Sequence, residues 1–157
     1  MNGMDKFYQD YVDRLKDLHQ DCQRVVDGLP QEALDWKPSP DMNSIVVLVV
    51  HIIGAERYWV GDVVLDEPSG RQRDQEFATS GLNPSELSQR LDDALDYIEH
   101  SLGSLTLTAL TEERASPRDG KIVTVGWSLL HVLKHTGLHL GHMEATRHMW
   151  EIRGHDR

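Results

Sequence analysis

Histidines carry the clearest chemical signal in this sequence of 157 residues, which contains nine of them. Six lie in the last 27 residues: His131, His135, His139, His142, His148 and His155. The first four follow one another at positions i, i+4, i+8 and i+11. Because an α-helix turns by about 100° per residue, these four side chains fall within about 80° of one another. They are therefore expected to share one face of a helix.

Two imidazoles one helical turn apart can bind the same metal ion, since their Cβ atoms lie about 5–6 Å apart. His51 directly follows the apolar run Ile45–Val50, and it is the expected third ligand from a second helix. Three protein ligands leave a position for water or a substrate, which is typical of catalytic metal sites. Spacing alone does not choose between the pairs His131/His135 and His135/His139. The alternative to a metal site is that these histidines are ordinary packed residues of the core.

Four helices are expected to position these histidines. Apolar residues recur at spacings of three and four over about residues 4–28, and a second, largely buried helix is expected over 45–65. The third begins at Asn83 with Pro84 and Glu86 in a capping-box pattern, and the fourth covers about 124–150. One short helical turn is expected within 31–36. Long connections at 66–81 and 103–123, the latter with a turn at 117–120, allow a topology other than simple up-down.

No alternating strand pattern and no internal repeat is visible between these segments. The sequence thus predicts an all-α four-helix bundle that forms a single domain over residues 1–157. Long loops separate the second helix from the third and the third from the fourth.

The composition excludes several classes of partner and site. Sixteen basic against 26 acidic residues give a net charge of −10, which argues against binding to nucleic acid or to an anionic membrane. The lone Cys22 excludes an intrachain disulfide and a cysteine-cluster zinc site, and it suits a reducing compartment. No apolar run approaches the roughly 18 residues of a membrane span, and no signal peptide is visible. A soluble cytoplasmic protein is expected.

Two stretches of the sequence resemble the DinB superfamily. The first comprises Trp36-Lys37-Pro38, then Asn43-Ser44-Ile45, then His51 to Trp59, similar to the family's W-x-P, N-S-[hydrophobic] and H-x-x-G-x-E-R-x-W patterns. The second, His135 to His142, is similar to H-x-x-x-H-R-G-Q. Leu140 and His142 stand where the common pattern has Arg and Gln.

The resemblance implies a four-helix bundle, commonly a homodimer, with a divalent metal held by His51, His135 and His139. His131 and His142 are candidates to support the ligands or to line a substrate cavity. Glu56 lies about 140° around its helix from His51, so it is expected to form a structural ion pair with Arg57 or with a neighbouring helix. Zinc is the first expectation for the ion, and nickel and other transition metals also accept imidazole ligands.

Three functions are compatible with such a site. A low-molecular-weight thiol bound to the ion would become a thiolate for transfer to an electrophilic small molecule, as in the thiol-dependent transferases and isomerases of the resembled family. A metal-bound water would instead make a hydrolase, which needs a general base. No Glu or Asp falls on the histidine face by spacing, so thiol chemistry is favoured. The third function is a non-catalytic, metal-stabilised bundle that binds a small ligand. Cys22 is expected to be a core residue and not a nucleophile.

Overall fold

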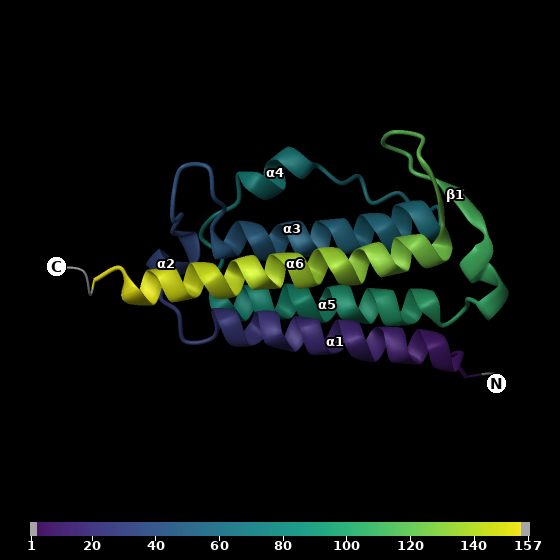
Figure 1. The fold of residues 1–157 in the computed structure, drawn as a ribbon, viewed down its shortest axis with the longest axis horizontal. Coiled ribbons are helices and arrows are strands. Elements are labelled where there is room, and N and C mark those ends of the chain that lie inside the picture. Colours follow the sequence, from purple (N-terminus) through teal and green to yellow (C-terminus); the bar gives the residue numbers. More distant parts are fainter. Residues whose placement is uncertain (1–2, 155–157) are drawn as a thin grey trace.

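A computed structural model describes residues 3–154, so His155 lies outside the described part of the chain. Four long helices lie side by side in one bundle (Figure 1). They are α1 (Lys6–Val26), α3 (Ile45–Arg57), α5 (Pro84–Leu102) and α6 (Val125–Ile152). Helix α1 packs on α5 and α6, and α3 packs on the same two helices. The predicted four-helix bundle is therefore confirmed.

The direction of the helices explains the long connection between α3 and α5. These two helices begin at the same end of the bundle, whereas α1 and α6 run the opposite way (Figure 1). At that end, Gln31 of the short helix α2 (Gln31–Asp35) donates a hydrogen bond to the carbonyl of Leu82 at 3.0 Å. The chain must therefore return along the bundle after α3 before α5 can begin. The returning segment carries the short helix α4 (Arg73–Phe77), which packs against α3.

Side-chain caps place the starts of the long helices where the sequence predicts them. The hydroxyl of Ser44 accepts a hydrogen bond from the backbone N–H of Val47 at 3.2 Å, at the start of α3. At the start of α5, the Asn83 side chain accepts from the Glu86 N–H, and the Glu86 carboxylate accepts from the Asn83 N–H, both at 2.9 Å. The capping box predicted for α5 is therefore present.

The second long helix departs from the prediction in its last turns. A single α-helix was expected over 45–65, but the α-helix ends at Arg57 and a π-helical segment, η1 (Tyr58–Val64), follows. Hydrogen bonds in a π-helix run from i to i+5, so the segment is wound more widely than an α-helix. The spacing of apolar residues in the sequence does not distinguish an α-helix from a π-helix over a segment of only seven residues.

A small sheet lies in the connection between α5 and α6, which also contains the 3₁₀-helix η2 (Leu107–Thr111). Strands β1 (Glu113–Ala115) and β2 (Ile122–Thr124) pair in antiparallel register. The expectation of no strand is wrong for this segment, because three residues are too few to show an alternating pattern. The predicted turn at 117–120 joins the two strands. Its Gly120 has φ +70°, a left-handed conformation that favours glycine.

Two clusters of buried apolar side chains fill the bundle. Tyr8 and Leu129 belong to one cluster, while Ile52 and Cys22 belong to the other. Burial raises the pKa of the Cys22 thiol to about 12, which agrees with the predicted core role. These apolar residues do not make a membrane span: no helix within residues 3–154 is both long and apolar enough for one.

Candidate metal centre

Three histidines from two neighbouring helices meet inside the bundle. His51 comes from α3, and His135 and His139 come from successive turns of α6. Nε2 of His135 lies 3.1 Å from Nε2 of His51 and 3.2 Å from Nε2 of His139. One ring nitrogen from each of the three residues lies within 4.8 Å of the others. His51 is buried and the other two are partly buried, so the cluster lies just below the surface.

The spacing of these nitrogens fits a divalent transition metal. Zinc–nitrogen bonds of about 2.0–2.1 Å in tetrahedral geometry would place the ligand nitrogens about 3.3 Å apart. The two measured separations, 3.1 and 3.2 Å, are close to that value. At these separations a neutral imidazole can also donate an N–H···N hydrogen bond to its neighbour, and a shared cation would take the place of that proton. The donor set of three imidazoles also suits zinc, nickel, cobalt, copper and iron.

A buried carboxylate holds His51 from behind. Nδ1 of His51 donates a hydrogen bond to Oε1 of Glu76 at 3.0 Å. Arg71 binds the same carboxylate through two nitrogens, Nε to Oε2 at 2.7 Å and Nη2 to Oε1 at 2.8 Å. Burial alone would raise the pKa of Glu76, but the hydrogen bonds and charges of Arg71 and His51 lower it below its usual value. An ionised carboxylate only accepts, so the His51 proton sits on Nδ1 and the Nε2 lone pair faces the cluster.

Gly54 makes room for this carboxylate. It lies one turn after His51 on α3, and a Cβ atom at this position would come within 2.0 Å of Oε2 of Glu76. No side chain larger than hydrogen fits there without moving the carboxylate. The glycine that follows the histidine in the H-x-x-G pattern therefore has a specific role in this chain, which is to let Glu76 reach His51.

His135 and His139 are held in the neutral form that metal binding requires. The pKa of His135 is lowered to about 3 and that of His139 to about 4. Burial is the largest cause in both cases, and the neighbouring histidines add to it by repulsion of like charge. Nδ1 of the exposed His142 lies 3.3 Å from Nδ1 of His139. Nδ1 of His135 is buried without a hydrogen-bond partner among residues 3–154.

His131 lies outside this group of three and belongs to an aromatic wall beside it. Its ring stacks on Trp127, with 4.9 Å between centroids and 9° between planes, and it meets Trp59 edge to face. The centroid of His131 lies 5.9 Å from that of His135. Burial is the main cause that lowers the pKa of His131, followed by repulsion from nearby cations such as Lys134. The structure thus separates the pair His135/His139 from His131, a choice that spacing alone leaves open.

The sequence interpretation missed the residues that approach from α4 and the segment before it. The ring of Phe77 lies 5.0 Å from that of His51, measured between centroids, and Glu76 and Arg71 contact His51 as described. By spacing, no Glu or Asp lies on the histidine face of α6, but an acidic side chain from another segment contacts His51. Glu76 comes from the 66–81 connection, which was interpreted as a polar loop. Spacing along α3 and α6 carries no information about that segment.

Glu56 forms a second buried polar cluster. Its carboxylate accepts hydrogen bonds from Nε2 of His19, at 2.9 and 3.0 Å, and from the Thr136 hydroxyl at 2.7 Å. Nδ1 of His19 donates to the carbonyl of Leu91 at 3.0 Å. Burial disfavours the charged imidazole, but the charge and hydrogen bond of Glu56, together with Leu91, raise the pKa of His19 overall. Glu56 is thus a structural ion-pair residue, and its partner is His19 of α1 and not Arg57.

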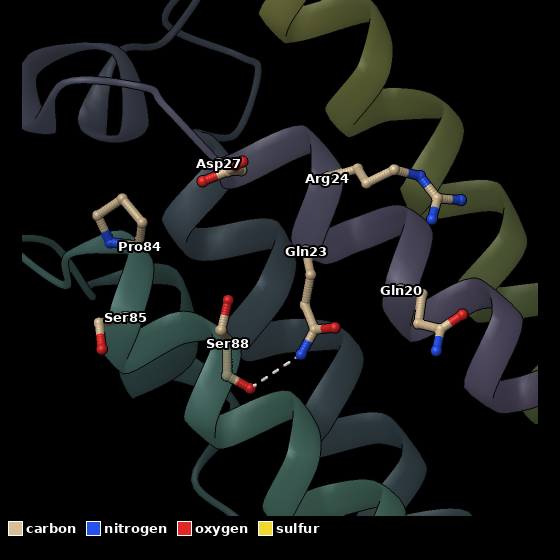
Figure 2. Close-up of a pocket in the computed structure, with 7 residues that line it drawn as sticks. All are labelled: Gln20, Gln23, Arg24, Asp27, Pro84, Ser85 and Ser88. Carbon is tan, nitrogen blue, oxygen red and sulfur yellow. Dashed lines mark hydrogen bonds between the residues drawn. The ribbon is translucent and has the colours of Figure 1, made fainter.

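A separate hollow at the surface between α1 and α5 carries no comparable chemistry. Figure 2 shows its polar lining, in which Gln23 donates a hydrogen bond to the backbone carbonyl of Ser88 at 3.3 Å. Its volume is about 590 Å³. It contains no histidine and only one acidic side chain, so it offers no metal-binding set. The lining residues are Gln20, Gln23, Arg24, Asp27, Pro84, Ser85 and Ser88.

Comparisons with known proteins agree with this fold. The chain is similar to a DinB-like protein from Bacillus cereus ATCC 10987, with a TM-score of 0.73, 15% identity and 91% of each chain covered. It is also similar to a conserved protein from Enterococcus faecalis, with a TM-score of 0.68, 16% identity, and 88% of this chain and 94% of the other covered. No curated protein matches the chain. The sequence profile of the DinB superfamily matches residues 14–143. The chain therefore belongs to the DinB superfamily.

Proposed function

We propose that His51, His135 and His139 bind a divalent metal ion, with zinc as the first candidate and nickel as the second. The observation that carries this proposal is the position of His135 Nε2, 3.1 Å from Nε2 of His51 and 3.2 Å from Nε2 of His139, with one ring nitrogen of each residue within 4.8 Å of the others. Two supporting features make the convergence unlike ordinary packing. Glu76 orients His51 with its lone pair toward the cluster, and the low pKa values of His135 and His139 keep their imidazoles neutral.

We further propose that the centre activates a low-molecular-weight thiol for transfer to an electrophilic small molecule. Three neutral ligands leave the divalent charge uncompensated, so a bound ion favours an anionic ligand and lowers the pKa of a thiol that binds to it. The protein's own contribution is to hold the three imidazoles, to exclude water beneath them and to offer a wall for the acceptor. The rings of Trp59 and His131, next to His135, and the ring of Phe77, next to His51, would supply that wall.

Hydrolysis is the weaker alternative because it needs a free general base. Glu76 is the carboxylate in contact with the cluster, and both of its oxygens accept hydrogen bonds, from His51 and from Arg71. Its lowered pKa makes it a poorer proton acceptor still. Transfer of a thiol that ionises on binding needs no such base. A non-catalytic ligand-binding bundle is the third function, and it predicts metal binding without turnover.

A homodimer remains a prediction from the family, and the surface of α6 supports it. Trp127, Leu130 and Leu138 are exposed on this helix, with Leu130 65% exposed. A contiguous apolar patch that is open to solvent often marks a protein–protein interface, so a patch formed by these side chains would fit a dimer.

An assay of thiol consumption tests the proposed function. Protein loaded with zinc or with nickel is incubated with cysteine or glutathione and an electrophile such as monobromobimane, beside His139→Ala and metal-free protein. The proposal predicts a rate of thioether formation above background that both controls lose. Turnover of ester or amide substrates by the loaded protein, without thiol, would favour hydrolysis instead. A metal-loaded protein that is inactive with every combination of thiol and electrophile would favour the non-catalytic bundle.

A further inference from the structure

A groove rich in arginine runs between α3 and α5, beneath the segment that returns from α3 to α5. It consists of two hollows, of about 460 Å³ and about 380 Å³. Ile53, Arg57 and Arg90 line both hollows, so the two form one continuous depression. The first hollow is further lined by Val50, Gly54, Ser69, Gly70, Arg71, Gln72, Gln75, Glu76 and Thr79.

The charge of the first hollow is opposite to that of the whole chain. Arg57, Arg71 and Arg90 line it together with one carboxylate, Glu76, although the chain has a net charge of −10. Both oxygens of Glu76 are already engaged by Arg71, and one also by His51. Arg57 is also paired, with 3.3 Å between its Nη1 and Oδ1 of Asp62, and Asp93 lines the adjoining hollow. Among the described residues, the guanidinium that has no acidic partner is therefore that of Arg90.

Two of the arginines keep donors free for a ligand. Arg90 makes no hydrogen bond or ion pair within residues 3–154. Arg57 uses only Nη1, which donates to Oδ1 of Asp62 at 3.3 Å and to the carbonyl of Glu67 at 3.0 Å. A guanidinium group has five N–H donors and binds carboxylate and phosphate groups in a fork geometry. The unused donors of Arg57 and Arg90 are therefore matched to an anionic group.

The second hollow offers an apolar surface next to this cationic one. Ile53, Ala94 and Ile98 contribute aliphatic side chains, Tyr97 contributes an aromatic ring, and Asp93 contributes one carboxylate. Arg57 lies over that ring, with its guanidinium carbon 4.4 Å from the centroid, which holds the arginine at the junction of the two hollows. A ligand that fits both parts has a charged head and an apolar body.

We propose that this groove binds a small organic anion, in which a carboxylate or phosphate group pairs with Arg57 and Arg90 and an apolar body lies against Ile53, Ala94 and Ile98. This site is distinct from the three histidines, and it does not depend on the proposed thiol chemistry. It is connected to them through Arg71 and Glu76, which line the groove and also hold His51.

Calorimetric titration of the full-length protein with three probes tests this inference. The probes are octanoate, octyl phosphate and the neutral octanol, which share one chain length. We expect at least one of the two anions to bind with a Kd of about 1 mM or tighter, and octanol to bind at least about tenfold more weakly. Equal binding of octanol and the anions, or no binding of either anion at that level, would overturn the proposal.

Two substitutions of equal charge locate the site. Arg90→Gln is expected to weaken binding of the anion about tenfold, because it removes a guanidinium from the groove. Arg14→Gln is the matched control, since Arg14 is exposed on α1 and pairs with Asp17. Equal loss in both variants would show that the effect is one of net charge, and that result would contradict the proposed site. Ala94→Phe, which fills the apolar hollow, is expected to weaken binding as well.

Zinc titration of the same variants separates the groove from the metal centre. Arg90 makes no hydrogen bond to the histidines or to Glu76 among the described residues, so Arg90→Gln is expected to keep the zinc affinity of the parent. A folded Arg90→Gln variant that loses zinc and the anion together would contradict an independent site.

Discussion

The carboxylate behind His51 can be tested with one isosteric substitution, Glu76→Gln. In the parent, Arg71 donates to both oxygens of Glu76, at 2.7 and 2.8 Å, and Nδ1 of His51 donates to one of them at 3.0 Å. A glutamine has a single acceptor oxygen, so it cannot satisfy all three donors. If that oxygen takes the place of Oε2, which accepts from Nε of Arg71, the amide N–H group takes the place of Oε1 and faces Nδ1 of His51. The imidazole proton then moves to Nε2, where it blocks the position that faces the other histidines.

The expected loss follows from the role of such supporting groups in metal sites. Removing the hydrogen-bond partner of a metal-binding histidine typically costs about 10–100-fold in metal affinity. That range corresponds to about 1.4–2.7 kcal/mol of binding free energy. We therefore expect Glu76→Gln to bind zinc about 10–100-fold more weakly than the parent, as measured by competition with a colorimetric chelator.

The control is Glu99→Gln, which makes the same change of charge at an exposed position of α5. It is expected to keep the affinity of the parent. Melting temperatures of the metal-free proteins report whether each variant is folded. A folded Glu76→Gln variant that binds zinc within about threefold of the parent would refute the role assigned to Glu76.

Three further predictions concern the buried polar groups and the close approach at α3. Glu56→Leu breaks a buried ion pair at a cost of about 3–5 kcal/mol, so we expect a melting temperature roughly 6–20 °C lower; an unchanged value would show that the pair contributes nothing. Gly54→Ala places a Cβ atom 2.0 Å from Oε2 of Glu76 and is expected to weaken zinc binding, whereas Gly137→Ala, whose Cβ meets nothing within 4 Å, is not. Burial and neighbouring imidazoles lower the pKa of His139 to about 4. Below about pH 6.5, His139 is therefore protonated in the unfolded metal-free chain but stays neutral in the folded one. The free energy of unfolding, measured with urea, should therefore decrease as the pH is lowered from 6.5 to 4, and it should decrease less steeply in His139→Ala. Equal pH dependence in the two proteins would contradict the lowered pKa.

The helices and the histidine cluster could be predicted because both depend on patterns within single helices. Apolar stripes and capping residues such as Asn83 define where a helix begins and which side it buries. The face shared by His135 and His139 follows from their spacing alone. His51 adds a polar group next to a long apolar run, which marks a buried position that needs a partner.

The supporting groups could not be predicted because they depend on the path of the chain between helices. Glu76 reaches His51 only because α3 and α5 are parallel, which sends the connecting segment back along α3 (Figure 1). Likewise, His19 lies among apolar residues of α1, and nothing in its spacing identifies Glu56 of α3 as its partner. Both pairings join residues at least 25 positions apart, and periodicity within one helix carries no information at that range.

Metal content of the untagged protein is the most direct test of the central claim. Inductively coupled plasma mass spectrometry on the parent, His51→Ala and His139→Ala is the measurement. The account predicts about one divalent ion per chain in the parent and its loss from both folded variants. A folded parent that contains no metal and refuses added zinc and nickel would contradict the account, and the histidine cluster would then be a feature of packing.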